Sequence, residues 1–158
     1  MSYDFNADDI FEIAEQLEKN GAKFYRNAAN GISDPASKEF LLKLAGMEDE
    51  HEKTFHSLRA TLTGKEKSPT VFDPQDEAVL YLQALADTRV FFEKEMTGTS
   101  MKEILKSAIE AEKDSIVFYL GMKDAVPEKS GRDKIEAIIK EEMGHIRILS
   151  SKLAGLKK

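Results

Sequence analysis

The sequence predicts an all-α protein, a four-helix bundle of two helical hairpins joined by a long crossover that contains a short helix. Four long stretches carry apolar residues at alternating spacings of three and four, which is typical of helices with one buried face, and strand signals are nearly absent. The segments that connect the expected helices are short within each half of the chain and long only in the middle, so each half is expected to form a hairpin. We expect a single domain, residues 1–158, long enough to bury a core.

Local signals set the bounds of the expected helices. Asp34 is a favourable N-cap, and Pro35 follows at the first helical position. Ser100 and Glu103 form a capping box later in the chain, and Gly155 is expected to stop the last helix. The expected helices cover about residues 8–30, 34–62, 73–95, 100–125 and 132–154, of which 73–95 is the short helix of the crossover.

Each long helix has one stripe of residues that faces the bundle axis, and ionisable groups interrupt every stripe. At about 1.5 Å of rise per residue, Glu18 and Glu48 lie equally far from the turn between their helices. Glu112 and Glu142 flank the second turn in the same way. We therefore expect one layer of six ionisable residues: Glu18, Glu48, His51, Glu112, Glu142 and His145.

Four carboxylates in an apolar bundle centre would repel one another and cost several kcal/mol each if unpaired. Two divalent cations would balance their charge, and the two imidazoles would complete the metal shells. One Glu-x-x-His motif is a weak signal, and a solvated acidic face is the alternative interpretation. Two such motifs, each matched by a lone glutamate on the preceding helix, favour a metal site.

An internal repeat relates the two halves of the chain. The segment EKNGAKFY, residues 18–25, resembles EKDSIVFY, residues 112–119. The two Glu-x-x-His motifs recur at the same offset as these segments. The chain therefore resembles a duplicated hairpin with equivalent ligands around a pseudo-twofold axis.

These motifs and the crossover topology resemble the di-iron carboxylate proteins of the ferritin-like superfamily, and most of all the rubrerythrin di-iron domain. The resemblance covers almost the whole chain. It implies two iron ions per chain, with Glu48 and Glu142 bridging them, Glu18 and Glu112 each binding one of them, and His51 and His145 supplying nitrogen ligands. Manganese or zinc could occupy the same ligands, because carboxylate and imidazole do not select iron.

Two departures from the family pattern bear on activity. Rubrerythrins carry a C-terminal rubredoxin-like module with cysteine-bound iron, whereas this sequence has no cysteine, so we expect a separate electron donor. Rubrerythrins also place an extra carboxylate one turn after the third-helix glutamate, where this chain has Ser115, with Gly21 at the repeat-equivalent position. The resemblance therefore implies peroxide reduction less firmly than it implies the metal site.

Several neighbours of the layer have two interpretations. Tyr25 and Tyr119, the candidate catalytic residues, could hydrogen-bond a ligand carboxylate or join electron transfer, or they could be ordinary core aromatics. The small residues Gly21, Ala22 and Ser115 could leave room for oxygen or peroxide, or they could allow close helix packing.

Four further features are expected to lie outside the ligand set. Glu141 points about a third of a turn away from Glu142 and is expected to be solvated or to support a ligand. Glu15 is expected in a surface salt bridge, and His56 lies off the stripe. The apolar segment Val90–Phe92 could cover the bundle or an interface.

We expect a redox enzyme that passes electrons from a reduced di-iron pair to hydrogen peroxide or dioxygen. The alternatives are a ferroxidase that handles iron for storage and a non-catalytic metal-binding bundle. A net charge of -6 without a basic patch argues against nucleic acid or an anionic membrane as a partner. The polar N-terminus and the lack of cysteine predict a cytoplasmic protein, and bundles of this class often form homodimers.

Overall fold

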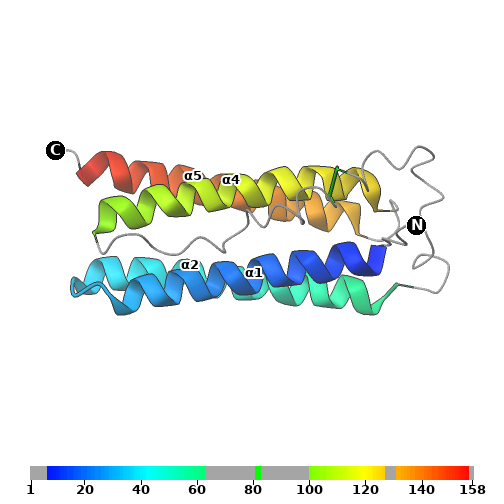
Figure 1. Ribbon diagram of the computed structural model, residues 1–158, viewed down its shortest axis with the longest axis horizontal. Helices are drawn as coiled ribbons and strands as arrows, with labels where there is room; N and C mark the ends of the chain where they lie inside the picture. Colours follow the sequence, from blue (N-terminus) through cyan, green and yellow to red (C-terminus); the bar gives the residue numbers. More distant parts are fainter. Residues whose placement is uncertain (1–6, 63–80, 83–99, 127–130, 157–158) are drawn as a thin grey trace.

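The residues that the structure describes form a bundle of four long helices (Figure 1). The computed structural model describes residues 7–62, 81–82, 100–126 and 131–156. Within these ranges there is no strand, so the predicted fold class is confirmed. The long helices are α1 (Ala7–Asn30), α2 (Pro35–Ala60), α4 (Met101–Ala125) and α5 (Arg132–Leu156).

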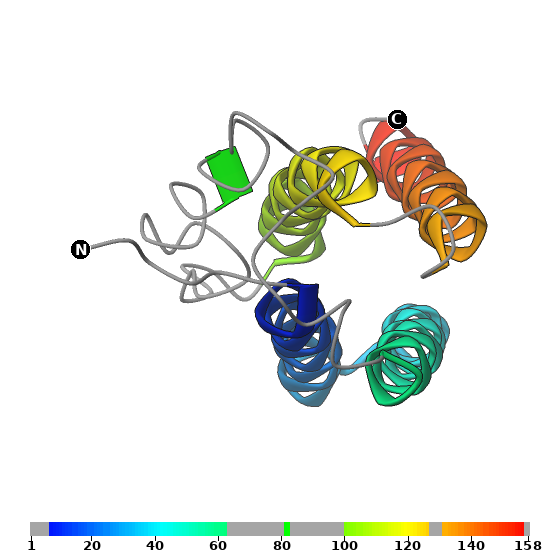
Figure 2. The same ribbon diagram turned by 90° about the vertical axis from the view of Figure 1, so that its right-hand side faces the viewer.

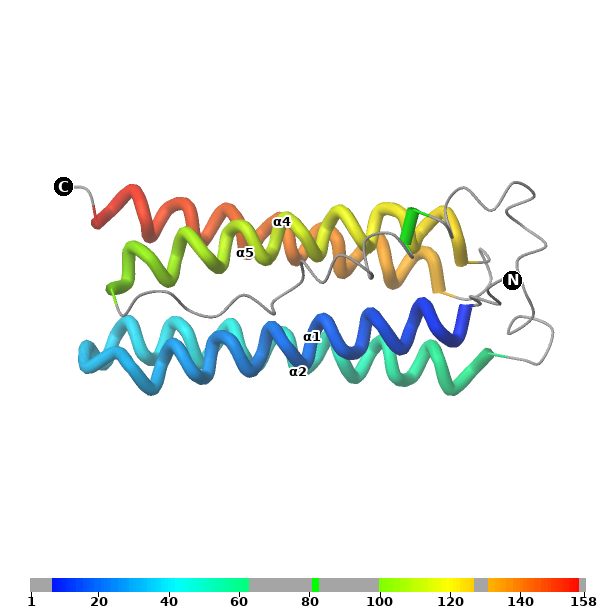
Figure 3. The backbone as a smooth tube through the Cα atoms, viewed as in Figure 1, coloured from blue at the N-terminus to red at the C-terminus, as the bar shows by residue number. Residues whose placement is uncertain are grey.

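Seen end-on, the helices occupy the corners of a quadrilateral, with α1 beside α4 and α2 beside α5 (Figure 2). The closest packing is within the hairpins, α1 with α2 and α4 with α5. Neighbouring helices run antiparallel, and α2 ends at the opposite end of the bundle from the start of α4 (Figure 3). This arrangement agrees with the predicted long crossover between the two hairpins. No helix in the described ranges has the length and apolarity needed to cross a membrane.

The predicted crossover helix, residues 73–95, lies outside the described residues except for Tyr81 and Leu82, which are helical. These two side chains lie against Gly121 of α4, where an added Cβ would meet the Tyr81 ring at 2.7 Å. Val90–Phe92 also lies outside the described residues.

The helix starts follow the predicted caps, and one predicted stop is wrong. The Asp34 carboxylate accepts hydrogen bonds from Ser37 N at 3.0 Å and Ser37 Oγ at 2.7 Å. Ser100 Oγ accepts from the Glu103 N–H at 3.2 Å. The last helix, however, continues through Gly155 to Leu156. A glycine inside a helix costs only about 1 kcal/mol, and it ends a helix only where it takes the left-handed conformation.

The predicted stripes form the core on both sides of the ionisable layer. Stripe residues on both sides of the layer are buried, among them Phe11, Leu44, Leu105 and Ile138, whereas Ile32 and Leu153 at the ends of their stripes are half-buried. Two apolar clusters result, one containing Phe11 and Phe55 and the other containing Leu105. The six ionisable residues lie between these clusters, so apolar side chains cover the layer toward both ends of the bundle.

Gly131, just before α5, is held in a conformation that favours glycine. Its φ is +103°, and an added Cβ would lie 2.5 Å from Leu58 Cδ2. We expect Gly131→Ala to lower the free energy of unfolding by about 1–3 kcal/mol, because both the backbone and the Leu58 side chain would have to shift. Gly46→Ala is the control, since an added Cβ there meets nothing within 4 Å. Urea denaturation should show Gly46→Ala to be neutral or stabilising; equal losses for both variants would contradict the prediction.

Candidate metal centre

The structure brings all six predicted ligand residues into one buried layer. Glu18 comes from α1, Glu48 and His51 from α2, Glu112 from α4, and Glu142 and His145 from α5. The most exposed of them, His51, has a relative exposure of only 4%. One turn of each helix therefore replaces apolar side chains with groups that can bind metal.

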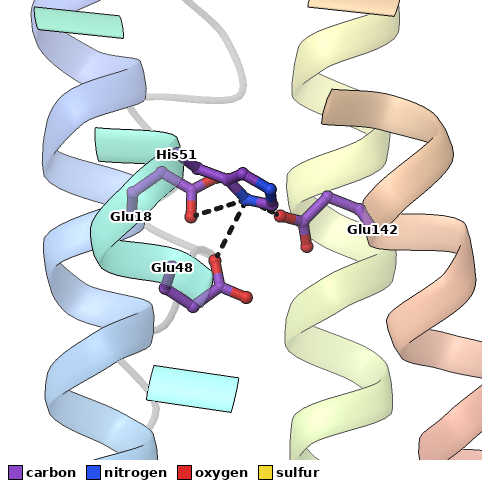
Figure 4. Close-up of side chains that lie close together, drawn as sticks. All are labelled: Glu18, Glu48, His51 and Glu142. Carbon is purple, nitrogen blue, oxygen red and sulfur yellow. Dashed lines mark ion pairs between the residues drawn. The ribbon is translucent and has the colours of Figure 1, made fainter. Parts of the chain in front are cut away.

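His51 lies at the centre of one half of the layer. Its Nδ1 is 2.7 Å from Glu142 Oε1. The same nitrogen is 3.6 Å from Glu18 Oε2 and 3.9 Å from Glu48 Oε2 (Figure 4). Three carboxylates from three helices thus converge on one imidazole nitrogen.

His145 has the corresponding position in the other half. Its Nδ1 is 3.2 Å from Glu48 Oε1 and 3.5 Å from Glu112 Oε1. Glu142 Oε2 completes the set at 3.6 Å. The two imidazole rings stack with centroids 5.8 Å apart and an interplanar angle of 20°. This pairing follows the pseudo-twofold relation expected from the internal repeat.

The donor atoms divide into two overlapping sets. One consists of Glu18, Glu48, His51 and Glu142, and the other of Glu48, Glu112, Glu142 and His145; within each set the donor atoms lie within 4.8 Å of one another. Glu48 and Glu142 belong to both sets. The layer therefore contains two adjacent groups of residues that could each hold a cation and that share two carboxylates.

Several donor atoms of the layer have no hydrogen-bond partner among the described residues, and such atoms are suited to bind a metal. Both Glu142 oxygens and the Nδ1 atoms of His51 and His145 are buried without hydrogen-bond geometry to any described residue, although carboxylates lie at ion-pair distance. One oxygen each of Glu18, Glu48 and Glu112 is in the same situation. Buried polar atoms are rarely left unpaired, so these lone pairs fit a shared cation. Oxygen and imidazole nitrogen donors suit iron, manganese and zinc.

The two predicted tyrosines connect the layer across the hairpins. The hydroxyl of Tyr25, on α1, donates to Glu112 Oε1 at 2.7 Å. The hydroxyl of Tyr119, on α4, donates to Glu18 Oε1 at 2.6 Å. Both rings are fully buried. Each tyrosine is therefore a core aromatic whose hydroxyl also bonds a carboxylate of the layer. Sequence reasoning did not identify which carboxylate each tyrosine contacts.

Burial and mutual repulsion change the proton affinities of the metal-free layer. Desolvation raises the pKa of Glu48 well above its ordinary value of 4.5, and repulsion from Glu18 and Glu142 adds to the effect. Desolvation also raises the pKa of Glu18. Burial opposes charge on His51, but its contacts with Glu142 and Glu18 outweigh this and raise its pKa to about 11. At Glu142, desolvation would raise the pKa, but the contacts of this carboxylate with His145 and His51 outweigh that effect and lower the pKa.

These shifts predict how the stability of the metal-free protein depends on pH. Glu18, Glu48 and His51 have raised pKa values in the folded state, so their stabilising contribution is complete at low pH and is lost as pH rises. Glu142 acts in the opposite sense, but its effect is confined to acid below its ordinary value of 4.5. We expect the Tm of the chelator-treated protein to fall between about pH 5 and pH 9. A Tm that rises across this range would contradict the shifts.

Three residues that the sequence analysis placed outside the ligand set, Glu141, His56 and Glu15, also have defined neighbours. Glu141 is solvated, with its side chain 57% exposed, and it also contacts His51 Nε2. His56 is exposed and lies outside both donor sets, with its Nδ1 3.3 Å from Glu15 Oε1. Glu15 forms ion pairs as expected, with exposed His56 and with Arg59 at 3.6 Å, but the Glu15 side chain itself is buried, with 8% exposure.

The small residues beside the layer are buried, which is compatible with both interpretations from the sequence. Gly21 and Ala22 lie in the buried face of α1. Ser115 is buried on α4, and its hydroxyl has no hydrogen bond to any described residue.

Removing either tyrosine hydroxyl should weaken metal binding. Tyr25→Phe and Tyr119→Phe each free a ligand carboxylate, and losses of such supporting hydrogen bonds typically cost 10- to 100-fold in metal affinity. Tyr81→Phe is the matched control, because Tyr81 is exposed and its hydroxyl, among the described residues, bonds the Val117 carbonyl at 3.4 Å. Calorimetric titration with Mn²⁺ measures the effect. Equal affinities for all three variants would show that the tyrosines only fill the core.

The fold and the buried carboxylate–imidazole layer place this protein in the ferritin-like class of helical bundles. A protein from Thermotoga maritima, whose crystal structure is named as that of a ferritin-like diiron-carboxylate protein, superimposes with a TM-score of 0.72 over 98% of each chain. Its sequence identity is 24%, so this likeness supports the fold alone. Among curated proteins the comparison finds no match. The chain belongs to the rubrerythrin family, whose sequence profile matches residues 9–153.

Proposed function

We propose that the buried layer binds two iron ions and that the protein reduces hydrogen peroxide or dioxygen with electrons from a separate donor. One observation carries this proposal: two overlapping sets of buried donor atoms share Glu48 and Glu142 and have unpaired lone pairs. The family supports iron over manganese or zinc, because the ligand types alone do not choose among these metals.

The residues of the layer have distinct parts in this proposal. Glu48 and Glu142 would bridge the two ions, since each belongs to both donor sets. Glu18 and Glu112 would each bind one ion, oriented by the tyrosine of the opposite hairpin. The charge of four carboxylates would balance two divalent cations.

The surroundings of the layer control what reaches it. The two apolar clusters exclude water from the ends of the bundle. Between α2 and α5, a pocket of about 390 Å³ is lined by Met47, Gly144 and Ile148 and reaches both histidines. A molecule as small as hydrogen peroxide or dioxygen would fit this route.

The proposed reaction needs electrons from outside the bundle. A bound pair of ferrous ions would supply two electrons, which together with two protons convert one hydrogen peroxide molecule into two water molecules. In the metal-free layer, Tyr25 and Tyr119 keep their protons, because desolvation raises the pKa of each hydroxyl well above 10.0. We therefore infer that they position Glu112 and Glu18 as neutral hydrogen-bond donors, and the separate donor returns the electrons.

The test is anaerobic reconstitution with Fe(II), a count of iron per chain, and rapid mixing with peroxide or oxygen while near-ultraviolet absorbance is recorded. Two irons per chain that oxidise faster with peroxide would support peroxide reduction. Faster oxidation by oxygen would favour an oxidase or a ferroxidase that handles iron. Stoichiometric iron without oxidation would indicate a non-catalytic metal-binding bundle, and failure to bind iron would contradict the proposed cofactor.

A further inference from the structure

The pseudo-twofold symmetry of the layer is broken at the outer nitrogens of the two histidines. His51 Nε2 is hydrogen-bonded to the carboxylate of Glu141. His145 Nε2 is buried and has no hydrogen bond to any described residue. The Nδ1 atoms of both rings face the carboxylates of the layer, so the difference is confined to the side that faces away from it.

The internal repeat explains why, among the described residues, only one of the two layer histidines has a partner for its Nε2. Glu141 immediately precedes the Glu-x-x-His motif of the second half, and the corresponding residue of the first half is Met47. Met47 and His145 line the same pocket, so the side chain at the equivalent place lies on the same side of the layer as His145. A thioether is only a weak acceptor, whereas a carboxylate accepts strongly.

A carboxylate on the outer nitrogen changes what the inner nitrogen can do. It accepts the ring N–H, fixes the tautomer that leaves Nδ1 free to bind metal, and raises the basicity of Nδ1. It also holds the ring in one orientation. His145 lacks these effects among the described residues, although its ring is equally buried.

We propose that Glu141 makes the two metal positions inequivalent, so that the ion beside His51 binds more tightly and is the first to load. Glu141 acts here as a positioning residue, through His51, and does not itself join either donor set. The inference rests on the metal-binding part of the proposed function. Because the Glu141 side chain is 57% exposed, we expect an effect near the lower end of the usual range, about 10-fold in affinity.

The test is a titration of the metal-free full chain with Co²⁺, followed by visible absorption, for the unsubstituted protein and three variants. Glu141→Gln should weaken the first binding step about 10-fold and leave the second nearly unchanged. Met47→Glu should strengthen the second step by supplying a carboxylate near His145. Glu110→Gln is the control: it removes one exposed charge on α4, where Glu110 pairs with Lys113 at 3.3 Å and does not line the pocket, and it should change neither step.

A second readout assigns the effect to one ring. In the Co²⁺-loaded protein, the proton NMR spectrum should contain one slowly exchanging, hyperfine-shifted imidazole N–H, from His51, and one that exchanges faster, from His145. Glu141→Gln should accelerate only the first. If Glu141→Gln changed neither binding step, or weakened both equally, the inference would be wrong although metal binding stood. Failure of every chain to bind Co²⁺ would instead overturn the metal site itself.

Discussion

Glu48→Gln is expected to abolish the binding of two metal ions per chain while leaving the metal-free protein as stable as before, or more so. Glu48 belongs to both donor sets, so its loss removes a ligand from each position. In the metal-free state burial raises the pKa of Glu48, which favours the protonated carboxyl group, and glutamine has the shape of that neutral form. Metal analysis after dialysis and urea denaturation measure the two effects.

Glu142→Gln is expected to lose metal in the same way but to destabilise the metal-free protein. Glu142 has a lowered pKa, because it is the ionised partner of His51 and His145. Removing that charge takes the nearest counterion away from the buried His51 imidazole, whose pKa is raised to about 11, at a cost of roughly 1–3 kcal/mol in the free energy of unfolding. The two glutamines therefore separate loss of metal from loss of structure.

His56→Ala provides the control for these variants. His56 is exposed and lies outside both donor sets, so its removal should leave the metal content unaltered. Loss of metal in His56→Ala would contradict the proposed ligand set. Retention of both metals by a chain carrying Glu48→Ala and Glu142→Ala together would contradict it as well.

Metal loading should produce the largest change in stability. A ligand present at 100 times its dissociation constant stabilises the folded state by about 2.7 kcal/mol per site, so two sites contribute roughly 5 kcal/mol. For a chain of this length that corresponds to a rise in Tm of about 10–20 °C. The physical reason is that the cations pair buried carboxylates that otherwise repel one another.

Thermal unfolding followed by circular dichroism, with Fe(II) or Mn²⁺ added and then removed by a chelator, measures this rise. The Glu48→Gln chain under the same conditions should show little change in Tm. An equal rise in that variant would mean that the metal stabilises the protein at another place, such as the exposed acidic residues.

The fold was predictable because its main determinant is periodic. Apolar residues at spacings of three and four define one face of each helix, and the structure buries these faces. Asp34 and Ser100 marked two helix starts correctly, because a cap depends on only three or four neighbouring residues. Gly155 misled the prediction of the last helix end, since glycine tolerates a helix as well as a stop.

The candidate site was predictable in composition but not in its contacts. Glu18 and Glu112 interrupt otherwise apolar stripes at matching heights, so their presence in one layer follows from helix geometry. The sequence did not show which tyrosine hydroxyl bonds which carboxylate. Tyr25 bonds Glu112, and Tyr119 bonds Glu18, although each tyrosine is much nearer in sequence to the other glutamate.

The sequence alone determined that this protein is a bundle of four long helices with six ionisable groups at its centre. The tertiary structure alone decided the crossed tyrosine bonds and the attachment of Glu141 to His51. The physical reason is that helix periodicity sets the face and height of a residue within its own helix. Contacts between hairpins depend instead on how each helix is rotated about its axis and on side-chain rotamers, which packing of the whole bundle selects.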